Sequence, residues 1–411
     1  MTRALTLLFA LVLAIFASPA AAHFTPNSVV ELDFASDHVV AQITIPTNEI
    51  AFATGKPWMN LAELARHIRA TTPDGRPWRV EPKSIRADVL QKQADLVAEI
   101  ALIPPPGTNL RRLTLRYDAL IDRLPSHIVM IFARSDFAGG ILQSEPQLIG
   151  ALQQDRTSLA IDRGAGSGWR GFGAAVRLGM HHIAEGHDHL LFLLTLLLPA
   201  PLLAASRRWN GYGGLRSMAR KLATIVTAFT IGHSITLIGG AFFNWRLPAQ
   251  PVEVGIALSI LISAIHAWRP VFAGREALVA GGFGLIHGLA FATIIGDFTI
   301  EPLYRAQAIL GFNVGIEIVQ LAVVAVMLPA LVVLGQSAAY PRIRSTGALL
   351  SGIAATAWAI ERILGKDNAA ARAIDAGLGY AIWPLGLVSL ACLAIIVFRQ
   401  SRWAGRYASS T

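Results

Sequence analysis

From about residue 172 onward, the sequence consists of long apolar runs separated by short polar loops, and this feature constrains the fold more than any other. A helix needs about 20 apolar residues to cross the hydrocarbon core of a bilayer. Because lipid offers no hydrogen-bond partners to the backbone, such runs predict a membrane α-helical bundle over residues 172–411. We expect about seven transmembrane helices, at 186–205, 221–242, 250–268, 277–296, 307–335, 344–363 and 379–398.

The composition supports a membrane protein and argues against an ordinary soluble enzyme and against a nucleic-acid-binding protein. Of the 411 residues, 54% are hydrophobic and only 15% are charged, whereas soluble domains carry about 25% charged residues. The net charge of +9 could indicate nucleic-acid binding, but the basic residues are spread over short loops instead of forming one patch. We therefore expect membrane lipids, and no nucleic acid, among the partners.

The N-terminus has the features of a secretory signal peptide over residues 1–22. Arg3 supplies the positive start, an apolar stretch covers 5–16, and three alanines at 20–22 form a small-residue cleavage site. An uncleaved anchor is the alternative, although the apolar stretch is short for a span. Cleavage would leave His23 as the new N-terminus and would export the segment that follows.

Residues 23–150 predict an exported, mainly-β, sandwich-like domain. Val30, Leu32 and Phe34 share one face of a strand because side chains alternate with period two, and 40–45, 113–117 and 128–132 repeat this pattern. One helix is expected at 60–70, with Asn60 as its cap. The Gly-rich residues 151–171 are expected to link this domain to the helices at 172–411.

The loops between the apolar runs predict the orientation. If the N-terminal domain lies outside, the loops and tail on the cytoplasmic side carry 12 Lys and Arg, against 5 on the other side. Cytoplasmic loops are enriched in these residues. The sequence therefore predicts a protein of the cytoplasmic (inner) membrane with its C-terminus in the cytoplasm.

Histidines and acids crowd the start of the first apolar run. His182, Glu185 and His189 lie at i, i+3 and i+7 of a helix and so share one face, while Asp188 can orient an imidazole ring. Ionisable groups inside a membrane cost about 2.5–3.5 kcal/mol each on insertion scales. Imidazoles with carboxylates suit divalent Ni, Co, Zn or Cu. The alternative is a His-rich helix start that only binds water.

Further polar residues lie deeper in the apolar runs or at their outer ends. Each could instead make an interhelical hydrogen bond worth about 0.6 kcal/mol, and we prefer that role for His266. The sequence predicts a cation path from an outer site to an internal one. The expected metal ligands are His182, Asp188, His189, His233, His287 and Glu317, with weaker support for Glu185, His187, Glu253 and Asn313.

At these residues the chain resembles the HupE/UreJ family of membrane proteins, in its larger form with an exported N-terminal domain. The resemblance is carried by the segments 182–189, 230–234, 284–288 and 313–317. It implies a permease for nickel or cobalt and assigns its His-five-residue-Asp-His pattern to His182, Asp188 and His189.

Three functions remain open from the sequence. The first is a divalent-metal permease, with Ni or Co favoured and Zn or Cu as alternatives. The second is a seven-span zinc-dependent membrane hydrolase, in which Glu317 or Asp188 would be the base. The third is a non-catalytic membrane partner of an exported protein. Cys392 is the single cysteine, which excludes an intrachain disulfide and any zinc site of several cysteines. The oligomeric state stays open.

Overall fold

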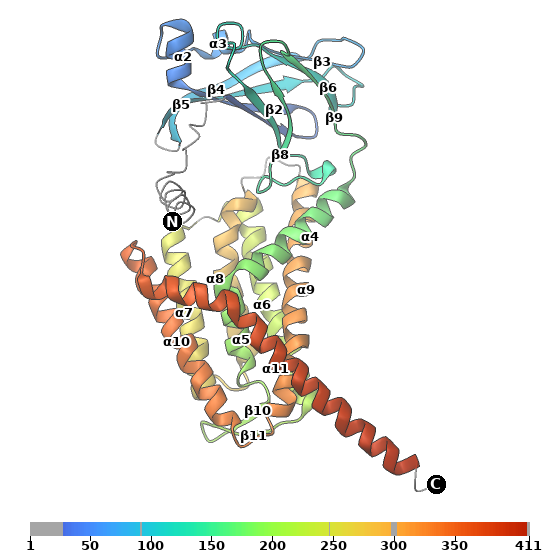
Figure 1. The fold of residues 1–411 in the computed structure, drawn as a ribbon, viewed down its shortest axis with the longest axis vertical. Coiled ribbons are helices and arrows are strands. Elements are labelled where there is room, and N and C mark those ends of the chain that lie inside the picture. Colours follow the sequence, from blue (N-terminus) through green and yellow to red (C-terminus); the bar gives the residue numbers. More distant parts are fainter. Residues whose placement is uncertain (1–27, 91–92, 246, 297–301, 409–411) are drawn as a thin grey trace, which may run out of the picture. The chain divides into compact units, whose positions relative to one another are not determined.

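The computed structural model describes residues 28–90, 93–245, 247–296 and 302–408 (Figure 1). The predicted signal peptide at 1–22 and His23 lie outside these ranges. The chain divides into two compact units. The β unit comprises Met1–Arg134 and Pro146–Gly164, and the helical unit comprises Ser135–Glu145 and Ala165–Thr411.

The β unit contains two sheets, and β1 runs alongside β7 in the same direction, since Ser28 N–H bonds to the Ile128 carbonyl and Asp33 to Arg134. The larger has six strands in the order β4-β5-β2-β1-β7-β8, and the smaller has three in the order β3-β6-β9. Short helices α2 (Thr47–Thr54) and α3 (Leu61–Leu64) lie between strands. The strands are β1 Ser28–Phe34, β2 Val39–Pro46, β3 Ile68–Thr71, β4 Arg79–Leu90, β5 Gln93–Ile103, β6 Arg112–Tyr117, β7 Val129–Ser135, β8 Gln147–Leu152 and β9 Ser158–Asp162.

Alternating burial in these strands confirms the mainly-β prediction. Val30 and Leu32 of β1 are fully buried, as are Leu115 and Tyr117 of β6. The Asn60 side chain caps the helix predicted at 60–70 by accepting from the Glu63 N–H at 2.8 Å. The predicted length is wrong, because the helix ends at Leu64. Tertiary pairing overrides the helical pattern beyond that point, because Ile68 pairs with Tyr117 in the smaller sheet.

The segment predicted as a linker at 151–171 has regular structure. Strand β9 pairs with β6, with Leu113 opposite Ile161, and helix α4 begins at Gly168. A short segment, 135–145, groups with the helical unit and contains the 3-10 helix η1 (Phe137–Gly139).

Among the described residues of the helical unit, five helices are long and apolar enough to cross a membrane, namely α6, α7, α9, α10 and α11. The apolar parts of α5 and α8 are shorter, at His187–Leu197 and Glu276–Phe291. Figure 1 shows α6, α7, α8, α9 and α10 running alongside one another, with α11 crossing them obliquely and the β10–β11 hairpin at one end. Their bounds are α4 Gly168–Glu185, α5 His187–Leu197, β10 Leu202–Ala205, β11 Arg208–Tyr212, α6 Leu215–Phe243, α7 Ala249–Trp268, α8 Glu276–Gly296, α9 Pro302–Leu334, α10 Tyr340–Leu364 and α11 Ala369–Ala408.

The prediction of a span at 186–205 is therefore wrong in its extent. Helix α5 has 11 residues and is followed by the β10–β11 hairpin. Pro199 and Pro201 stand directly after the helix, and proline both lacks an N–H and clashes with the preceding turn. An 11-residue helix is about 16 Å long, about half the thickness of the hydrocarbon core.

Two pairs of helices approach each other closely through glycines. In the pair α6 and α8, a side chain at Gly232 would collide with the Gly281 carbonyl, and one at Gly284 with the Phe229 carbonyl. In the pair α4 and α9, a side chain at Gly179 would collide with the Phe312 carbonyl, and one at Gly315 with the Val176 carbonyl. Small residues of this kind allow helix backbones to pack closely in membranes.

Candidate functional site

The site begins at a break between two helices. Helix α4 ends at Glu185 and α5 begins at His187, with Gly186 between them in a non-helical conformation (φ −74°, ψ 91°). The break lies between two histidines and brings their rings together, because the centroids of His182 and His189 are 4.7 Å apart. A side chain at Gly186 would lie 2.8 Å from the His182 carbonyl oxygen and 2.9 Å from His189 Nδ1. Glycine is thus required where the chain turns beside the rings.

Two more histidines come from the α6–α8 pair. The ring centroid of His287 lies 4.8 Å from that of His189, and the centroid of His233 lies 6.5 Å from that of His182. His233 and His287 are fully buried, and His189 is 7% exposed. Four rings from four helices therefore lie together, and we call these four residues the histidine cluster.

The neighbours of two rings determine which nitrogen carries a lone pair. Asp188 Oδ1 lies 2.8 Å from His189 Nδ1, so this nitrogen donates and Nε2 keeps its lone pair. The Ser259 hydroxyl gives its one proton to the Ile256 carbonyl at 2.7 Å, so its oxygen accepts from His287 Nε2 at 2.9 Å. His287 Nδ1 then carries the lone pair. In its neutral form, each of these rings therefore has one nitrogen that can donate an electron pair.

Within the part of the chain that the structure describes, five buried ring nitrogens of the histidine cluster have no hydrogen-bond partner. They are His182 Nε2, His189 Nε2, His287 Nδ1 and both nitrogens of His233. Buried polar atoms in folded proteins are nearly always paired, because an unpaired one costs about 1–3 kcal/mol. A neutral imidazole has a lone pair on only one of its two nitrogens, so up to four of these five atoms can donate an electron pair. Their concentration in one place indicates a site for an electron-pair acceptor.

The described residues do not form a finished metal site. Among them, no three His, Cys, Asp or Glu side chains surround one point closely enough to hold a metal ion as they stand. The spacing is nevertheless suitable for pairs of rings. Two imidazoles bound to one ion through nitrogens at about 2.0–2.1 Å have centroids about 4.5–5.2 Å apart, and two pairs in the cluster lie at 4.7 and 4.8 Å. Ring rotation would complete a site.

Phenylalanines surround the histidine cluster and exclude water from it. Phe291 lies 4.8 Å from the His182 ring, and Phe192 lies 5.1 Å from the His287 ring. The rings of Phe291 and Phe312 stack on each other, with their centroids 4.3 Å apart. Ion–ligand attraction is stronger in such a low-dielectric environment than in water.

Other predicted ligands take different places. Asn313 is buried beside His233, and its amide donates to the Ile309 carbonyl at 2.9 Å. Glu317 lies one turn further along α9, about 6 Å away along the axis, and within the described residues no hydrogen bond or ion pair joins it to the histidine cluster. Its role as a ligand stays a prediction.

The weaker candidates also lie apart from the histidine cluster. Glu185 is exposed and bonds to His181 at 3.1 Å. His187 faces Asp375 of α11 at 3.6 Å. Glu253 lies 3.8 Å from Arg362, with its side chain 48% exposed. These residues contact other partners, so the structure gives them no direct place among the four rings.

Two further residues contact the site, although neither was predicted from the sequence. Ser259 orients His287, as described above. Arg362 of α10 extends to Asp188, with 3.6 Å between its Nη2 and Asp188 Oδ2. The neighbouring Glu361 has a different partner, because it accepts from the Asn368 N–H at 2.9 Å. Only the packing of α10 near α5 reveals the role of Arg362.

His266 lies elsewhere and has its own partners. Its Nδ1 accepts from the Phe272 N–H at 3.2 Å, and its ring stacks on Phe272 at 3.7 Å. The sequence predicted a hydrogen bond from His266 to a neighbouring helix, but its partner Phe272 lies in a loop. His266 has a structural role at the end of α7.

Comparison with known proteins identifies the family. Residues 156–362, just over half of the chain, match the family described as HupE / UreJ protein. No curated protein and no solved structure gives a significant match. The matched range includes the entire histidine cluster, Asp188, Ser259 and Arg362. The chain belongs to the HupE/UreJ family.

Proposed function

We propose that the helical unit carries a divalent transition-metal ion, nickel or cobalt in the first place, across the cytoplasmic membrane through the histidine cluster. The observation that carries this proposal is the group of five unpartnered ring nitrogens in a buried, phenylalanine-lined site. Imidazole nitrogen is a preferred ligand of Ni, Co, Zn and Cu. The HupE/UreJ family is associated with nickel and cobalt transport, which favours the first two ions.

The incomplete geometry fits transport better than permanent binding. A structural metal site holds its ligands in closed tetrahedral geometry, whereas a transported ion must also leave. Rings that need rotation to meet on one ion allow binding and release. Asp188 adds a negative charge beside His189, which favours a cation at the cluster.

The proposal includes an orientation and a location. We infer that the β unit lies outside the cytoplasmic membrane and that the C-terminus lies inside. The excess of basic residues, 12 against 5, on the loops assigned to the cytoplasm supports this orientation. The β unit would then be available to an exported partner protein.

The test compares two adjacent histidines. His182→Gln removes one ring of the cluster, while His181→Gln removes an exposed ring that bonds only to Glu185. Uptake of radiolabelled nickel and cobalt would be measured in cells with matched amounts of each variant in the membrane. We expect His182→Gln to lower uptake at limiting metal by at least about tenfold and His181→Gln to leave it unchanged.

Two outcomes would overturn the proposal. Equal uptake in both variants and in cells without the protein would exclude metal transport. Zinc that copurifies at one ion per chain and does not exchange with free metal would instead favour the membrane hydrolase.

A further inference from the structure

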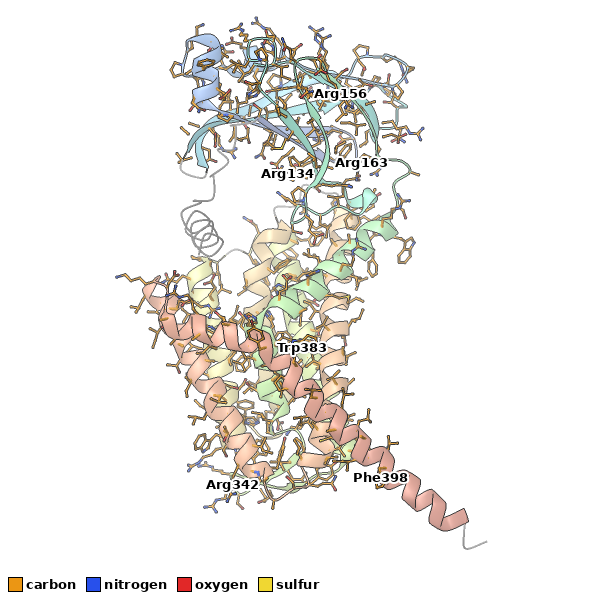
Figure 2. The ribbon with its side chains drawn as sticks, viewed as in Figure 1. Arg134, Arg156, Arg163, Arg342, Trp383 and Phe398 are labelled. Atoms are coloured by element: carbon orange, nitrogen blue, oxygen red, sulfur yellow. The ribbon has the colours of Figure 1, made fainter. Side chains whose placement is uncertain are left out.

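The far end of the helical unit contains a pocket of about 790 Å³ that is unrelated to the histidine cluster. It lies between the β10–β11 hairpin, the end of α7 and the first turns of α10. Figure 2 labels Arg342, which marks this end of α10. We call it the arginine pocket, because its lining includes Arg207, Arg208, Arg269 and Arg344, together with Trp209 and Trp268.

The four arginines of the pocket are not neutralised. Within the described part of the chain, no carboxylate lies within ion-pair distance of any of them, and the nearby Glu276 is engaged by Lys221 at 2.8 Å. Four like charges around one cavity repel each other unless an anion lies between them. The absence of acidic partners therefore indicates an anionic ligand.

Arg344 gives the pocket a fixed, buried donor. It is 9% exposed, and its Nη1 donates to the carbonyl oxygens of Ala267 and Trp268 at the end of α7. Its Nε is buried and has no partner. A guanidinium held in place in this way is prepared to bind a planar or tetrahedral oxyanion with its remaining N–H groups.

The hairpin that supplies Arg207 has an unfavourable backbone. Ala205 pairs with Arg208, so Ser206 and Arg207 form a two-residue loop, and both have positive φ (48° and 58°). Such loops strongly prefer Asn-Gly or Gly-Gly. A non-glycine residue is strained in this conformation. The arginine is thus present at a position where glycine would be more stable.

We propose that the arginine pocket binds a phosphate group, carried either by an anionic phospholipid headgroup or by a soluble phosphate compound. Phosphate matches the fork geometry of guanidinium groups. The pocket lies at the ends of the apolar helices α7 and α10, the depth at which lipid headgroups are found, and tryptophan is enriched at that depth. The proposal is independent of metal transport.

The test uses the purified full-length protein. Binding of phosphatidylglycerol, of phosphatidylcholine with the same acyl chains, and of inorganic pyrophosphate would be titrated by native mass spectrometry. The variant Arg207→Gln/Arg269→Gln removes two exposed charges from the pocket. The control Arg216→Gln/Arg220→Gln removes two exposed charges from the first turns of α6, outside the lining.

We expect the pocket variant to bind phosphatidylglycerol at least about tenfold more weakly, from about a tenfold loss per 1.4 kcal/mol and about 1 kcal/mol per basic residue near an anionic lipid. The control should bind as the wild type does. Arg207→Gly separates folding from binding, because it removes one guanidinium while relieving the positive φ. It should raise the thermal unfolding midpoint and still weaken binding.

Each result decides the question. If only phosphatidylglycerol binding depends on the pocket, the ligand is a lipid headgroup. If pyrophosphate binds and shows the same dependence, the source is soluble, and the phosphate site stands. The proposal is overturned if phosphatidylglycerol binds no more tightly than phosphatidylcholine and pyrophosphate does not bind, or if the pocket and control variants lose affinity equally.

Discussion

The Arg362 guanidinium lies 3.6 Å from the Asp188 carboxylate, and the same guanidinium lies 3.8 Å from the carboxylate of Glu253. Asp188 in turn holds the His189 ring. The positive charge of Arg362 therefore lies next to Asp188, the anionic residue of the proposed metal site. It competes with an arriving metal cation for this carboxylate. Movement of Arg362 toward Glu253 would leave Asp188 free for the metal.

This relationship predicts that Arg362→Gln strengthens divalent-metal binding. Two charges about 4 Å apart interact by about 4 kcal/mol at an effective dielectric constant of 20, and both side chains here are partly exposed, so we expect a more modest, few-fold to about tenfold decrease in Kd. Titration calorimetry with nickel on the purified protein measures it. Arg362→Lys should stay close to the wild type, and weaker binding in Arg362→Gln would contradict the competition.

Gly186→Ala is predicted to impair the site without unfolding the protein. The added methyl group would lie 2.8–2.9 Å from the His182 carbonyl oxygen and His189 Nδ1, so the break between α4 and α5 must shift. We expect a loss of about tenfold or more in metal uptake, since ligand misplacement of about 1 Å has effects of that size or larger. Gly282→Ala on α8, where a methyl group meets nothing within 4 Å, is the matched control. Similar uptake in both variants would count against the role of the break.

Substitutions of the two buried serines of α7 are predicted to have different effects on metal affinity. Ser259 accepts from His287 Nε2, whereas Ser263 bonds only to the Ser259 backbone carbonyl, at 2.8 Å. Ser259→Ala should lower metal affinity by about 10-fold to 100-fold, the usual effect of losing a residue that orients a histidine ligand. Ser263→Ala should change affinity little. Metal titration of both proteins checks this, with thermal unfolding to show that their stabilities are comparable.

The β unit is predicted to lose stability in mild acid through His127. This residue is buried, its Nε2 bonds to Ser28 Oγ at 2.8 Å, and burial lowers its pKa below the ordinary 6.5 despite Glu49 at 3.4 Å. The unfolded chain therefore binds a proton at a higher pH than the folded one does. Stability is fully present above pH 6.5 and falls as the pH drops from 6.5 toward the folded pKa.

Hydrogen exchange in β1 and β2 of the full-length protein, corrected for intrinsic rates, measures this loss between pH 7.5 and 5.5. His127→Gln should flatten the pH dependence, and His38→Gln, at an exposed turn, serves as the control. An equal loss of protection in wild type and His127→Gln would assign the effect to other groups.

The sequence predicted elements well where a local period decides them. The alternation of Val30, Leu32 and Phe34 correctly indicated strand β1, and apolar length correctly located α6, α7, α9 and α10. Prediction from the sequence failed where tertiary packing determines the secondary structure. Ile68 continues a helical pattern yet pairs with Tyr117, and no local rule shows this.

The same distinction applies to the site. The cost of burying His182, His189, His233 and His287 marked all four as unusual, and the structure brings them together. Spacing placed Glu317 one turn beyond Asn313 but did not show whether it reaches the rings, and among the described residues no hydrogen bond or ion pair joins it to them. Arg362 is more than 170 residues from Asp188 in sequence, and only the arrangement of α5 and α10 brings them close.

The glycine contacts described for the helix pairs also determine how the protein can move. The contacts between α6 and α8 lock His233 and His287 into one rigid body, and those between α4 and α9 lock His182 and Asn313 into another. The two bodies meet at the stacked rings of Phe291 and Phe312. The bodies are also joined by Arg305 of α9, which donates to the Ala241 carbonyl of α6 at 2.8 Å. Alternating access by sliding of one body against the other would have to shift both contacts. Such a movement would carry His182 away from His233 and His287 and so open the histidine cluster.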